Sequence, residues 1–323
     1  MACHLRLLQC GIARRGLKPQ FRALLFGERG DDHVIRGANV VAQFAARPFG
    51  ILSGHQTEAN PFLNRPAYAE IADLPLPERV ARLKDPAVRE RILGSERIAD
   101  GPGFGALLDI PEMFWKMFPL GDPPDYEPRP EQSIAGIAEK ENRPAQEVLY
   151  DHMLKDEGRE LLLLPFFNYS DGDLSPMLEM IDHERTVLSL GDGGAHCGII
   201  CDASLTTFML SHWVRDRSRG RRIPVEQSVH RMTQHTAQLY GLLDRGVLAP
   251  GYKADVNIID PERIQLHRPE MAHDLPSGAR RLLQRASGYC ATLVSGEIVM
   301  QDGEATQARP GRLIRGEKSA PSA

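Results

Sequence analysis

Short apolar runs separated by polar turns give the first indication of structure in this chain. The runs at 40–52, 160–167 and 186–190 are rich in β-branched and apolar residues, which is typical of strands buried on both faces of a sheet. Apolar residues at helical spacing predict a helix over 174–181, between the second and third runs. A strand, a helix and a strand in succession predict a parallel sheet, because parallel neighbours need a crossover connection.

Helical spacing also predicts helices at 134–141, 144–154, 204–214 and 225–240. The last of these is the best marked, because Pro224 stands at its start and Gly241 is placed to cap its end. Its apolar side recurs at helical spacing through Val225, Val229, Met232, Thr236, Leu239 and Tyr240. Prolines and glycines are dense from 101 to 130, where we expect a long insertion with little regular structure.

The pattern changes near Gly246, where short β segments begin to alternate with turn residues. Ser295-Gly296 and Asp302-Gly303 are dipeptides typical of hairpin turns. We therefore expect a separate β-rich module over 246–316. The residues at 317–323 are small and polar, which predicts a disordered tail.

Composition and charge narrow the function classes. The 323 residues are 42% hydrophobic with a formal net charge of −4, so they favour neither nucleic acid nor an anionic membrane as partner. The longest apolar run, 161–167, is too short to span a bilayer, which needs about 20 apolar residues. Five cysteines without paired spacings are typical of a reducing compartment. We predict a cytoplasmic protein with a small-molecule partner.

The segment 1–36 is atypical and basic. No Asp or Glu occurs before Glu28, whereas Arg and Lys are spread through this stretch, which resembles an organelle transit peptide. The alternative is an N-terminus created by truncation or by a misassigned start. The abrupt beginning of the body favours that alternative.

Asp192 is the best candidate for a catalytic residue. It closely follows the run 186–190, and in parallel α/β barrels the carboxyl ends of the strands carry the active site. Gly193 and Gly194 leave room beside the carboxylate for a metal, a water or a substrate. Hydrolysis needs such a group to hold or deprotonate a water and then return the proton to the leaving nitrogen. The alternative is that Asp192 caps an ordinary Asp-Gly-Gly turn.

A longer pattern favours the catalytic interpretation. The segment 191–204, G-D-G-G-A-H-C-G-I-I-C-D-A-S, resembles the S-D-G-G-A-H loop of the amidohydrolase superfamily, in the branch of the N-acyl-D-amino-acid deacylases. The resemblance extends to Q-F-A-A-R-P-F-G at 43–50, Y-D-H-M-L at 150–154, F-N-Y-S-D-G-D-L at 167–174, and the stretches 232–260 and 294–303. The motifs in this order form one specific signal.

The resemblance implies an α/β fold with the C-terminal part of a metal-dependent-hydrolase β/α (TIM-like) barrel over 37–245 and a small β-sandwich over 246–316. It also implies zinc at the barrel mouth and hydrolysis of the amide bond of an N-acylated D-amino acid. In that picture Asp192 is the metal-proximal general acid and base. A cyclic amidase, similar to a dihydroorotase or a hydantoinase, is an alternative that keeps the chemistry and changes the substrate.

One departure from the family pattern concerns the metal. The family's first barrel strand carries a His-x-His metal pair, and no His-x-His occurs in this sequence. The chain therefore resembles the second half of such an enzyme, and a catalytically incomplete fragment or partner subunit is the rival hypothesis. An open sheet edge would also favour association with another chain, such as a homo-oligomer.

Three further residues are candidates beside Asp192. His196 lies in the same loop and either contacts substrate or orients the loop backbone. Arg47 either binds a substrate carboxylate or forms an ion pair that fixes its loop. His55 either faces the barrel mouth, where it could bind metal, or lies in a surface loop. His230 and His235 are five residues apart on a helix and are expected on different faces, and the Cys197 and Cys201 spacing is not that of a metal or redox pair.

Overall fold

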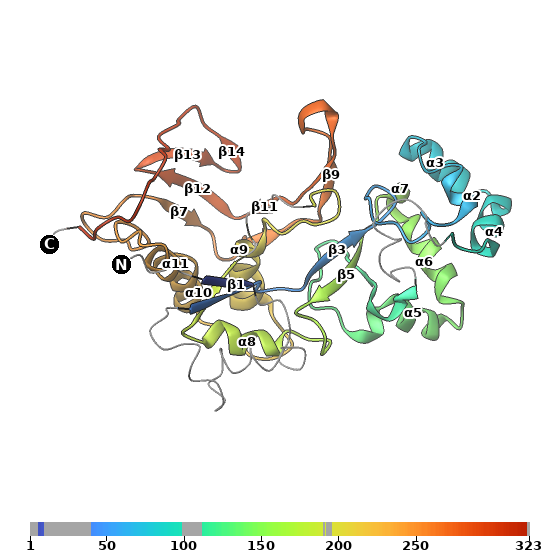
Figure 1. Ribbon diagram of the computed structural model, residues 1–323, viewed down its shortest axis with the longest axis horizontal. Coiled ribbons are helices and arrows are strands. Elements are labelled where there is room, and N and C mark those ends of the chain that lie inside the picture. Colours follow the sequence, from blue (N-terminus) through green and yellow to red (C-terminus); the bar gives the residue numbers. More distant parts are fainter. Residues whose placement is uncertain (1–5, 10–39, 99–111, 190, 192–195, 322–323) are drawn as a thin grey trace.

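The computed structural model describes residues 6–9, 40–98, 112–189, 191 and 196–321. In Figure 1 a helical region with α2 to α7 lies at one end of the molecule, and a β-rich region with β7 and β12 to β14 lies at the upper part of the other end. Below the β-rich region lies a short parallel sheet with β1, beside α8, α10 and α11, which we call the middle region. The fold is mixed α/β, as the sequence predicted.

The middle region contains a three-stranded parallel sheet. Its strands, in the order β1-β2-β6, are β1 (Arg6–Gln9), β2 (Val40–Phe44) and β6 (Thr186–Leu188). Both strand pairs are parallel, and Ala42 lies opposite Thr186. The carboxyl ends of β2 and β6 therefore meet at one edge of the sheet.

The apolar run 40–52 forms two strands where one was expected. β2 ends at Phe44, and β3 (Phe49–Ser53) begins a different sheet. Pro48 lies between the two strands, and a proline has no N–H to donate to a strand ladder. The chain therefore changes sheets at this point.

The second sheet is antiparallel and has the order β3-β5-β4. β5 (Leu162–Phe167) pairs with β3 on one side and with β4 (Phe118–Pro119) on the other. The prediction that 160–167 and 186–190 are parallel neighbours is wrong, because β5 and β6 belong to different sheets. An apolar run indicates that a strand is buried, but it does not indicate which strand lies beside it.

The helical region packs around this antiparallel sheet. Its helices are α2 (Pro66–Ala69), α3 (Leu76–Leu83), α4 (Pro86–Gly94), η3 (Phe114–Lys116), η4 (Pro130–Gln132), α5 (Ile134–Glu141), α6 (Ala145–Met153) and α7 (Lys155–Gly158). The predicted helices at 134–141 and 144–154 are confirmed. Ser133 accepts a hydrogen bond from the Gly136 N–H at 3.1 Å at the start of α5, and Asn142 adopts a left-handed conformation at its end.

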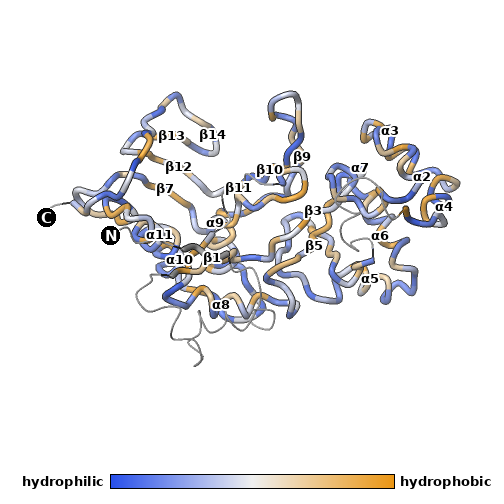
Figure 2. Tube along the Cα trace, in the orientation of Figure 1, coloured by the Kyte–Doolittle hydropathy of each residue, from blue (hydrophilic) through white to orange (hydrophobic). Residues whose placement is uncertain are grey.

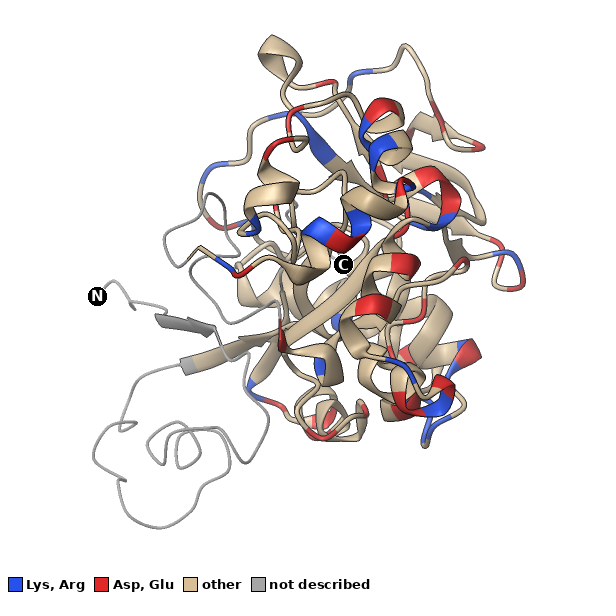
Figure 3. Ribbon diagram, turned by 90° about the vertical axis from the view of Figure 1, so that its right-hand side faces the viewer, with Lys and Arg blue, Asp and Glu red and all other residues tan. Residues whose placement is uncertain are grey.

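Two apolar clusters form the interior. One cluster joins β5 to the helical region and includes Phe62, Tyr68 and Tyr150, and the other surrounds Trp213 and Phe44. Figure 2 shows apolar stretches along β3 and β5, whereas the outer turns are hydrophilic. Figure 3 shows acidic and basic residues mixed along the ribbon of the helical end.

The helices beside the parallel sheet include those expected at 174–181 and 204–214, whereas the helix expected at 225–240 is divided in two. They are α8 (Ser175–Asp182), α9 (Leu205–Phe208), the π-helical segment η5 (Met209–Asp216), α10 (Val225–Met232) and α11 (Gln234–Leu239). The predicted helix at 225–240 breaks at Thr233, whose φ of −118° and ψ of −90° are not helical. Val225 and Val229 are each 44% exposed, although their spacing is typical of a buried face.

The C-terminal region is β-rich, as expected from Gly246 onward. Its strands are β7 (Val256–Ile259), β8 (Gln265–Leu266), β9 (Glu270–Ala272), β10 (Arg281–Leu283), β11 (Ala286–Ser287), β12 (Tyr289–Val294), β13 (Glu297–Gln301) and β14 (Glu304–Ala305), with η6 (Pro276–Gly278) between β9 and β10. Four of them form the antiparallel sheet β14-β13-β12-β7. Ser295-Gly296 and Asp302-Gly303 connect its hairpins with positive φ angles, which confirms both predicted turns.

The C-terminal tail is more ordered than expected as far as residue 321. The Lys318 N–H donates to the Gly241 carbonyl at 2.8 Å, and the Leu243 N–H donates to the Lys318 carbonyl at 3.0 Å. These bonds hold the tail against the end of α11. Within the described part of the chain, no helix has the length and apolar content needed to cross a bilayer.

Candidate active site

The candidate site lies where β2 and β6 end. The hydrogen bonds between β2 and β6 continue one residue past β6, where the Ser189 N–H donates to the Phe44 carbonyl at 3.0 Å. Gly191 follows at an exposed position, and the predicted catalytic Asp192 lies outside the described residues. The segment that leads to Asp192 therefore leaves the sheet beside the segment that leads from β2 to Arg47.

Arg47 is almost fully buried and is bound to the loop after Gly191. Its guanidinium donates to Ser204 Oγ at 3.0 Å, to Asp202 Oδ1 at 3.2 Å and to the Cys201 carbonyl. It also lies over the Tyr126 ring, 4.0 Å from the centroid. Arg47 thus forms an ion pair with Asp202 in this loop. Its side chain is only 2% exposed, and its guanidinium donates to acceptors of the protein itself.

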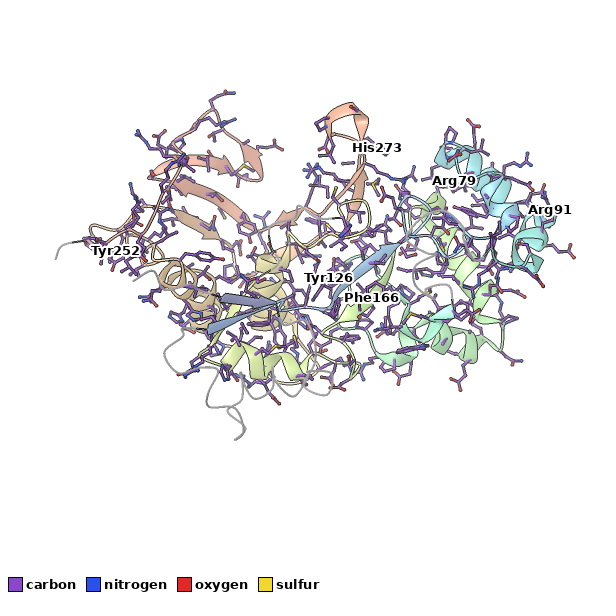
Figure 4. The ribbon with its side chains drawn as sticks, in the orientation of Figure 1. Arg79, Arg91, Tyr126, Phe166, Tyr252 and His273 are labelled. Carbon is purple, nitrogen blue, oxygen red and sulfur yellow. The ribbon has the colours of Figure 1, made fainter. Side chains whose placement is uncertain are left out.

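Gln284 extends this network into the β-rich region. Its Oε1 accepts from Ser204 Oγ, and its Nε2 donates to the Tyr126 hydroxyl at 3.0 Å. Figure 4 shows Tyr126 between the middle and helical regions, where these contacts meet. Sequence reasoning missed Tyr126 and Gln284, because 158 residues separate them and no local pattern connects them.

Arg47→Lys is expected to lower the free energy of unfolding by about 2 kcal/mol, because a lysine ammonium cannot reach three acceptors in the planar arrangement of a guanidinium. Urea unfolding at pH 7 measures this change. Arg285→Lys is the control, because Arg285 is 69% exposed in its pair with Glu270 and should change the free energy by less than about 0.5 kcal/mol. Equal effects of the two substitutions would contradict the role assigned to Arg47.

His196 begins the described part of the loop after Asp192. Its φ is +49°, an uncommon value for a residue other than glycine. Its carbonyl accepts from the Ile199 and Ile200 N–H groups, both at 2.9 Å. The backbone of His196 therefore orients the loop, and the contact of its side chain with a substrate stays a prediction.

His55 lies at the end of β3 in the interior of the helical region, and not in a surface loop. Its Nδ1 lies 3.0 Å from the Tyr68 hydroxyl and 3.2 Å from Asn60 Nδ2. Asn60 Nδ2 also donates to that hydroxyl at 2.6 Å, so the hydroxyl proton is available to His55. Burial and the nearby positive charge of Arg79 lower the pKa of His55 to about 3, so the ring is neutral.

Two buried histidines predict a loss of stability in mild acid. The folded-state pKa of His55 is about 3 and that of His152, lowered mainly by burial, is about 4, whereas the unfolded value is near 6.5. Below pH 6.5 the unfolded chain binds more protons, so each histidine removes about 1.4 kcal/mol of stability per pH unit. Urea unfolding between pH 7 and 5 measures this fall. His152→Gln should reduce the slope by about half, and an unchanged slope would contradict the assignment.

His230 and His235 lie closer together than their spacing suggests. Their rings stack with centroids 5.9 Å apart, which corrects the expectation of different helix faces. The break at Thr233 brings the two rings together, because the five residues no longer follow one regular helix. Arg231 also lies 3.5 Å from His235 Nδ1.

His212 has an acidic partner that local spacing did not reveal. Its Nε2 lies 2.8 Å from Glu127 Oε2, and Arg217 binds the same carboxylate through Nε and Nη2, both at 3.1 Å. The Leu174 N–H donates to Glu127 Oε1 at 2.9 Å. Burial alone would raise the pKa of Glu127, but these hydrogen bonds outweigh it and lower the pKa to about 2.

The donor set for a metal is not present in the described part of the chain. Among these residues no three or more His, Cys, Asp or Glu side chains lie close enough together to hold a metal ion. The zinc expected from the sequence therefore does not fit the described side chains.

Comparisons with known proteins agree with the resemblance in the sequence. Residues 143–300 match the model of the amidohydrolase family. The chain is similar to two proteins of Alcaligenes xylosoxydans xylosoxydans, an N-acyl-D-aspartate deacylase (34% identical over 109 residues) and a D-aminoacylase (31% identical over 106 residues). Each match covers 33% of this chain and 19% of the relative, so the chain spans only a small part of these relatives.

Solved structures are also similar to the chain. A D-aminoacylase with a binuclear metal centre is 16% identical, with a TM-score of 0.42, and the match covers 94% of this chain and 48% of that one. An N-acyl-D-glutamate deacylase from Bordetella bronchiseptica, complexed with zinc and a phosphonate inhibitor, is 17% identical, with a TM-score of 0.39 and coverage of 93% and 48%. TM-scores of this size do not establish a common fold. The similarity to the amidohydrolase family therefore depends on the sequence matches.

Proposed function

We propose that the chain belongs to the amidohydrolase family, whose model matches residues 143–300, and that it is a hydrolase of amide bonds in N-acylated D-amino acids. The single observation that supports the substrate class is the 34% identity to an N-acyl-D-aspartate deacylase. The finer architecture, a partial β/α barrel with a small β-sandwich, belongs to the same proposal.

The proposal assigns Asp192 as general acid and base. The carboxyl ends of β2 and β6 lie side by side, and the chain passes from β6 through Gly191 directly to Asp192. A carboxylate at that point would take a proton from the attacking water and deliver it to the amide nitrogen as the C–N bond breaks. Arg47 would act as a positioning residue, since its bonds to Cys201, Asp202 and Ser204 hold the far end of the same loop.

A panel of amides tests the proposed function. The purified full chain would be incubated with N-acetyl-D-aspartate, N-acetyl-D-leucine, their L-enantiomers, dihydroorotate and hydantoin, and the released amine or ring-opened product would be measured. We expect hydrolysis of the linear D-compounds above that of the L-compounds and the cyclic amides. Preferred hydrolysis of a cyclic amide would support the cyclic amidase, and no hydrolysis of any compound would overturn the proposal.

The same panel tests the proposed zinc dependence. Assays with added zinc would be compared with assays in a chelator, and bound zinc would be measured by elemental analysis. The resemblance to the N-acyl-D-amino-acid deacylases implies a higher rate with zinc, whereas the described residues, which lack a set of metal ligands, favour equal rates. Equal rates with zinc and with the chelator would contradict a zinc requirement of this chain.

A further inference from the structure

An exposed apolar surface lies beyond α11, where two segments without helix or strand meet. Leu248 is 90% exposed and Leu313 is 76% exposed, the two highest values among the large apolar side chains of the described residues. They belong to the segments 240–253 and 309–318, which we call the C-terminal patch. Figure 4 shows Tyr252, from the first segment, at the end of the molecule opposite the helical region. The exposed large apolar side chains of the patch are Tyr240, Leu243, Leu248, Leu313 and Ile314.

Backbone contacts hold the two segments side by side. The Lys318 N–H donates to the Gly241 carbonyl at 2.8 Å, and the Leu243 N–H donates to the Lys318 carbonyl at 3.0 Å. The backbone of Gly251 also approaches Pro321 so closely that a Cβ at position 251 would lie 2.9 Å from the Pro321 Cβ. The apolar side chains of both segments therefore belong to one surface. Single exposed apolar side chains are common, whereas a group of them marks an interaction site.

Basic side chains accompany these apolar groups. The two segments contain two carboxylates, and one of them, Asp244, pairs with Arg245 at 2.9 Å. Arg245 also pairs with Asp255, just past the first segment, at 3.2 Å. The other carboxylate, Glu317, is exposed and is accompanied by five basic side chains. In the described part of the chain no carboxylate forms an ion pair with any of these five, which are Lys253, Arg309, Arg312, Arg315 and Lys318.

The charge of the C-terminal patch differs from the charge of the whole chain. The net charge of −4, which favours no anionic partner, counts all 323 residues. Salt screens charges that lie more than about 10 Å apart, so a membrane surface responds to the side chains that face it. The C-terminal patch is cationic in a protein that is anionic overall, and its charge is complementary to that of anionic lipid headgroups.

We propose that the C-terminal patch binds the surface of a membrane that contains anionic lipids. Leu248, Leu313 and Ile314 would enter the boundary between headgroups and acyl chains, where an apolar side chain leaves water. The guanidinium groups of Arg312 and Arg315 would bind lipid phosphates, because a long basic side chain can keep its charge at the headgroups while its carbon stem contacts apolar groups. Apolar burial and charge attraction both act at this one surface, so binding depends on both.

A bilayer suits this surface better than a protein partner does. A specific protein interface buries about 800 Å² on each side and needs complementary shapes. The patch offers apolar side chains that project from turns and irregular chain, with basic side chains beside them. A fluid bilayer adapts to such groups without a preformed pocket.

Co-sedimentation of the full chain with lipid vesicles tests the proposal. The vesicles would contain either phosphatidylcholine alone or phosphatidylcholine with about 30% phosphatidylglycerol, and binding would be measured at low and at high salt. We expect binding to the anionic vesicles to be about tenfold stronger than to the neutral ones, and to fall at high salt because the charges are then screened. Equal binding to both kinds of vesicle, or no binding to either, would overturn the proposal.

A tryptophan reporter shows which end of the molecule meets the membrane. Leu248→Trp places an indole in the patch, whereas Ile98→Trp places one in the helical region, where Ile98 is 49% exposed. Both variants keep the two native tryptophans, so the background emission is the same. We expect anionic vesicles to shift the emission to shorter wavelength in Leu248→Trp only, because its indole moves into the less polar membrane interface. The same shift in both variants would contradict the proposed surface.

Charge and apolar variants test the two contributions separately. Arg312→Gln and Arg315→Gln should each weaken binding to anionic vesicles about fivefold, since each basic side chain near a membrane surface contributes about this factor. Arg82→Gln is the matched control, because Arg82 is exposed in α3 of the helical region, and it should leave binding unchanged. Leu313→Ser should weaken binding about tenfold, and Ile98→Ser is its control. All five side chains are exposed, so each variant should fold.

Two further outcomes separate a membrane from other partners. Binding of the full chain to heparin or to an acidic peptide, without binding to anionic vesicles, would identify a soluble polyanion or a protein as the partner and overturn the proposal. Binding to anionic vesicles that Leu313→Ser and both arginine variants leave unchanged would assign the contact to another surface and overturn it as well. Hydrolysis of the amide panel is a separate measurement, and its outcome does not alter this one.

Discussion

Replacement of Asp192 by asparagine is expected to lower the rate of amide hydrolysis by about 10²- to 10⁴-fold, the usual contribution of a positioned general acid or base. Asparagine keeps the size of the side chain but cannot take up the proton of the attacking water. The rate would be measured with the best compound of the amide panel, at saturating and at low substrate. We expect the loss in kcat and in kcat/KM alike, because proton transfer acts on the transition state.

The free energy of unfolding of Asp192→Asn decides whether the loss is chemical. We expect a change within about 0.5 kcal/mol, since the substitution is nearly isosteric. Asp260→Asn serves as the control, because Asp260 caps a turn in the β-rich region through the Glu262 N–H at 3.0 Å. An Asp192→Asn protein as active as this control would exclude Asp192 as the general acid and base.

Replacement of Glu127 by alanine is expected to lower the free energy of unfolding by about 3 to 5 kcal/mol. Glu127 is 4% exposed and lies between His212, the Leu174 N–H and the Arg217 guanidinium. The side chain of Arg217 is fully buried, so its charge would lose its carboxylate and could not regain water. Chemical denaturation at pH 7 measures the loss, and fluorescence of Trp213, which packs against Arg217, follows the same transition.

A surface pair provides the matched control for Glu127. Glu70 binds Arg91 at 2.5 Å, and both side chains are 55% exposed. Glu70→Ala should change the free energy of unfolding by less than about 1 kcal/mol, because exposed ion pairs contribute little. A Glu127→Ala protein that is no less stable than Glu70→Ala would show that the buried network does not stabilise the fold.

Elements defined by local residue patterns could be predicted from the sequence. Helix α5 begins and ends where the apolar spacing indicated, and the Ser295-Gly296 turn has the positive φ angles that its residues favour. The position of β6 and the glycine after it also followed from the sequence, because a strand that ends at a glycine is a local pattern. These features depend on interactions between residues that are close in the chain.

Pairing between distant segments could not be predicted in this way. The sequence joined β5 and β6 in one sheet, whereas β5 pairs with β3 and β6 pairs with β2. It placed Val225 and Val229 on a typical buried face, whereas both are 44% exposed. It also gave no sign that Tyr126 and Gln284 meet at Arg47. Each outcome depends on which apolar surfaces bury one another. The spacing of residues within one segment does not indicate which distant segment will pack against it.

The candidate site shows the same division. The sequence alone determined the position of β6, the family resemblance and the lack of a His-x-His pair in these 323 residues, since each is a local or linear pattern. Only the tertiary structure showed that Arg47 pairs with Asp202 and that His55 is buried in the helical region. Burial and hydrogen-bond partners are properties of the packed structure, because they arise when distant segments pack together and remove a side chain from water.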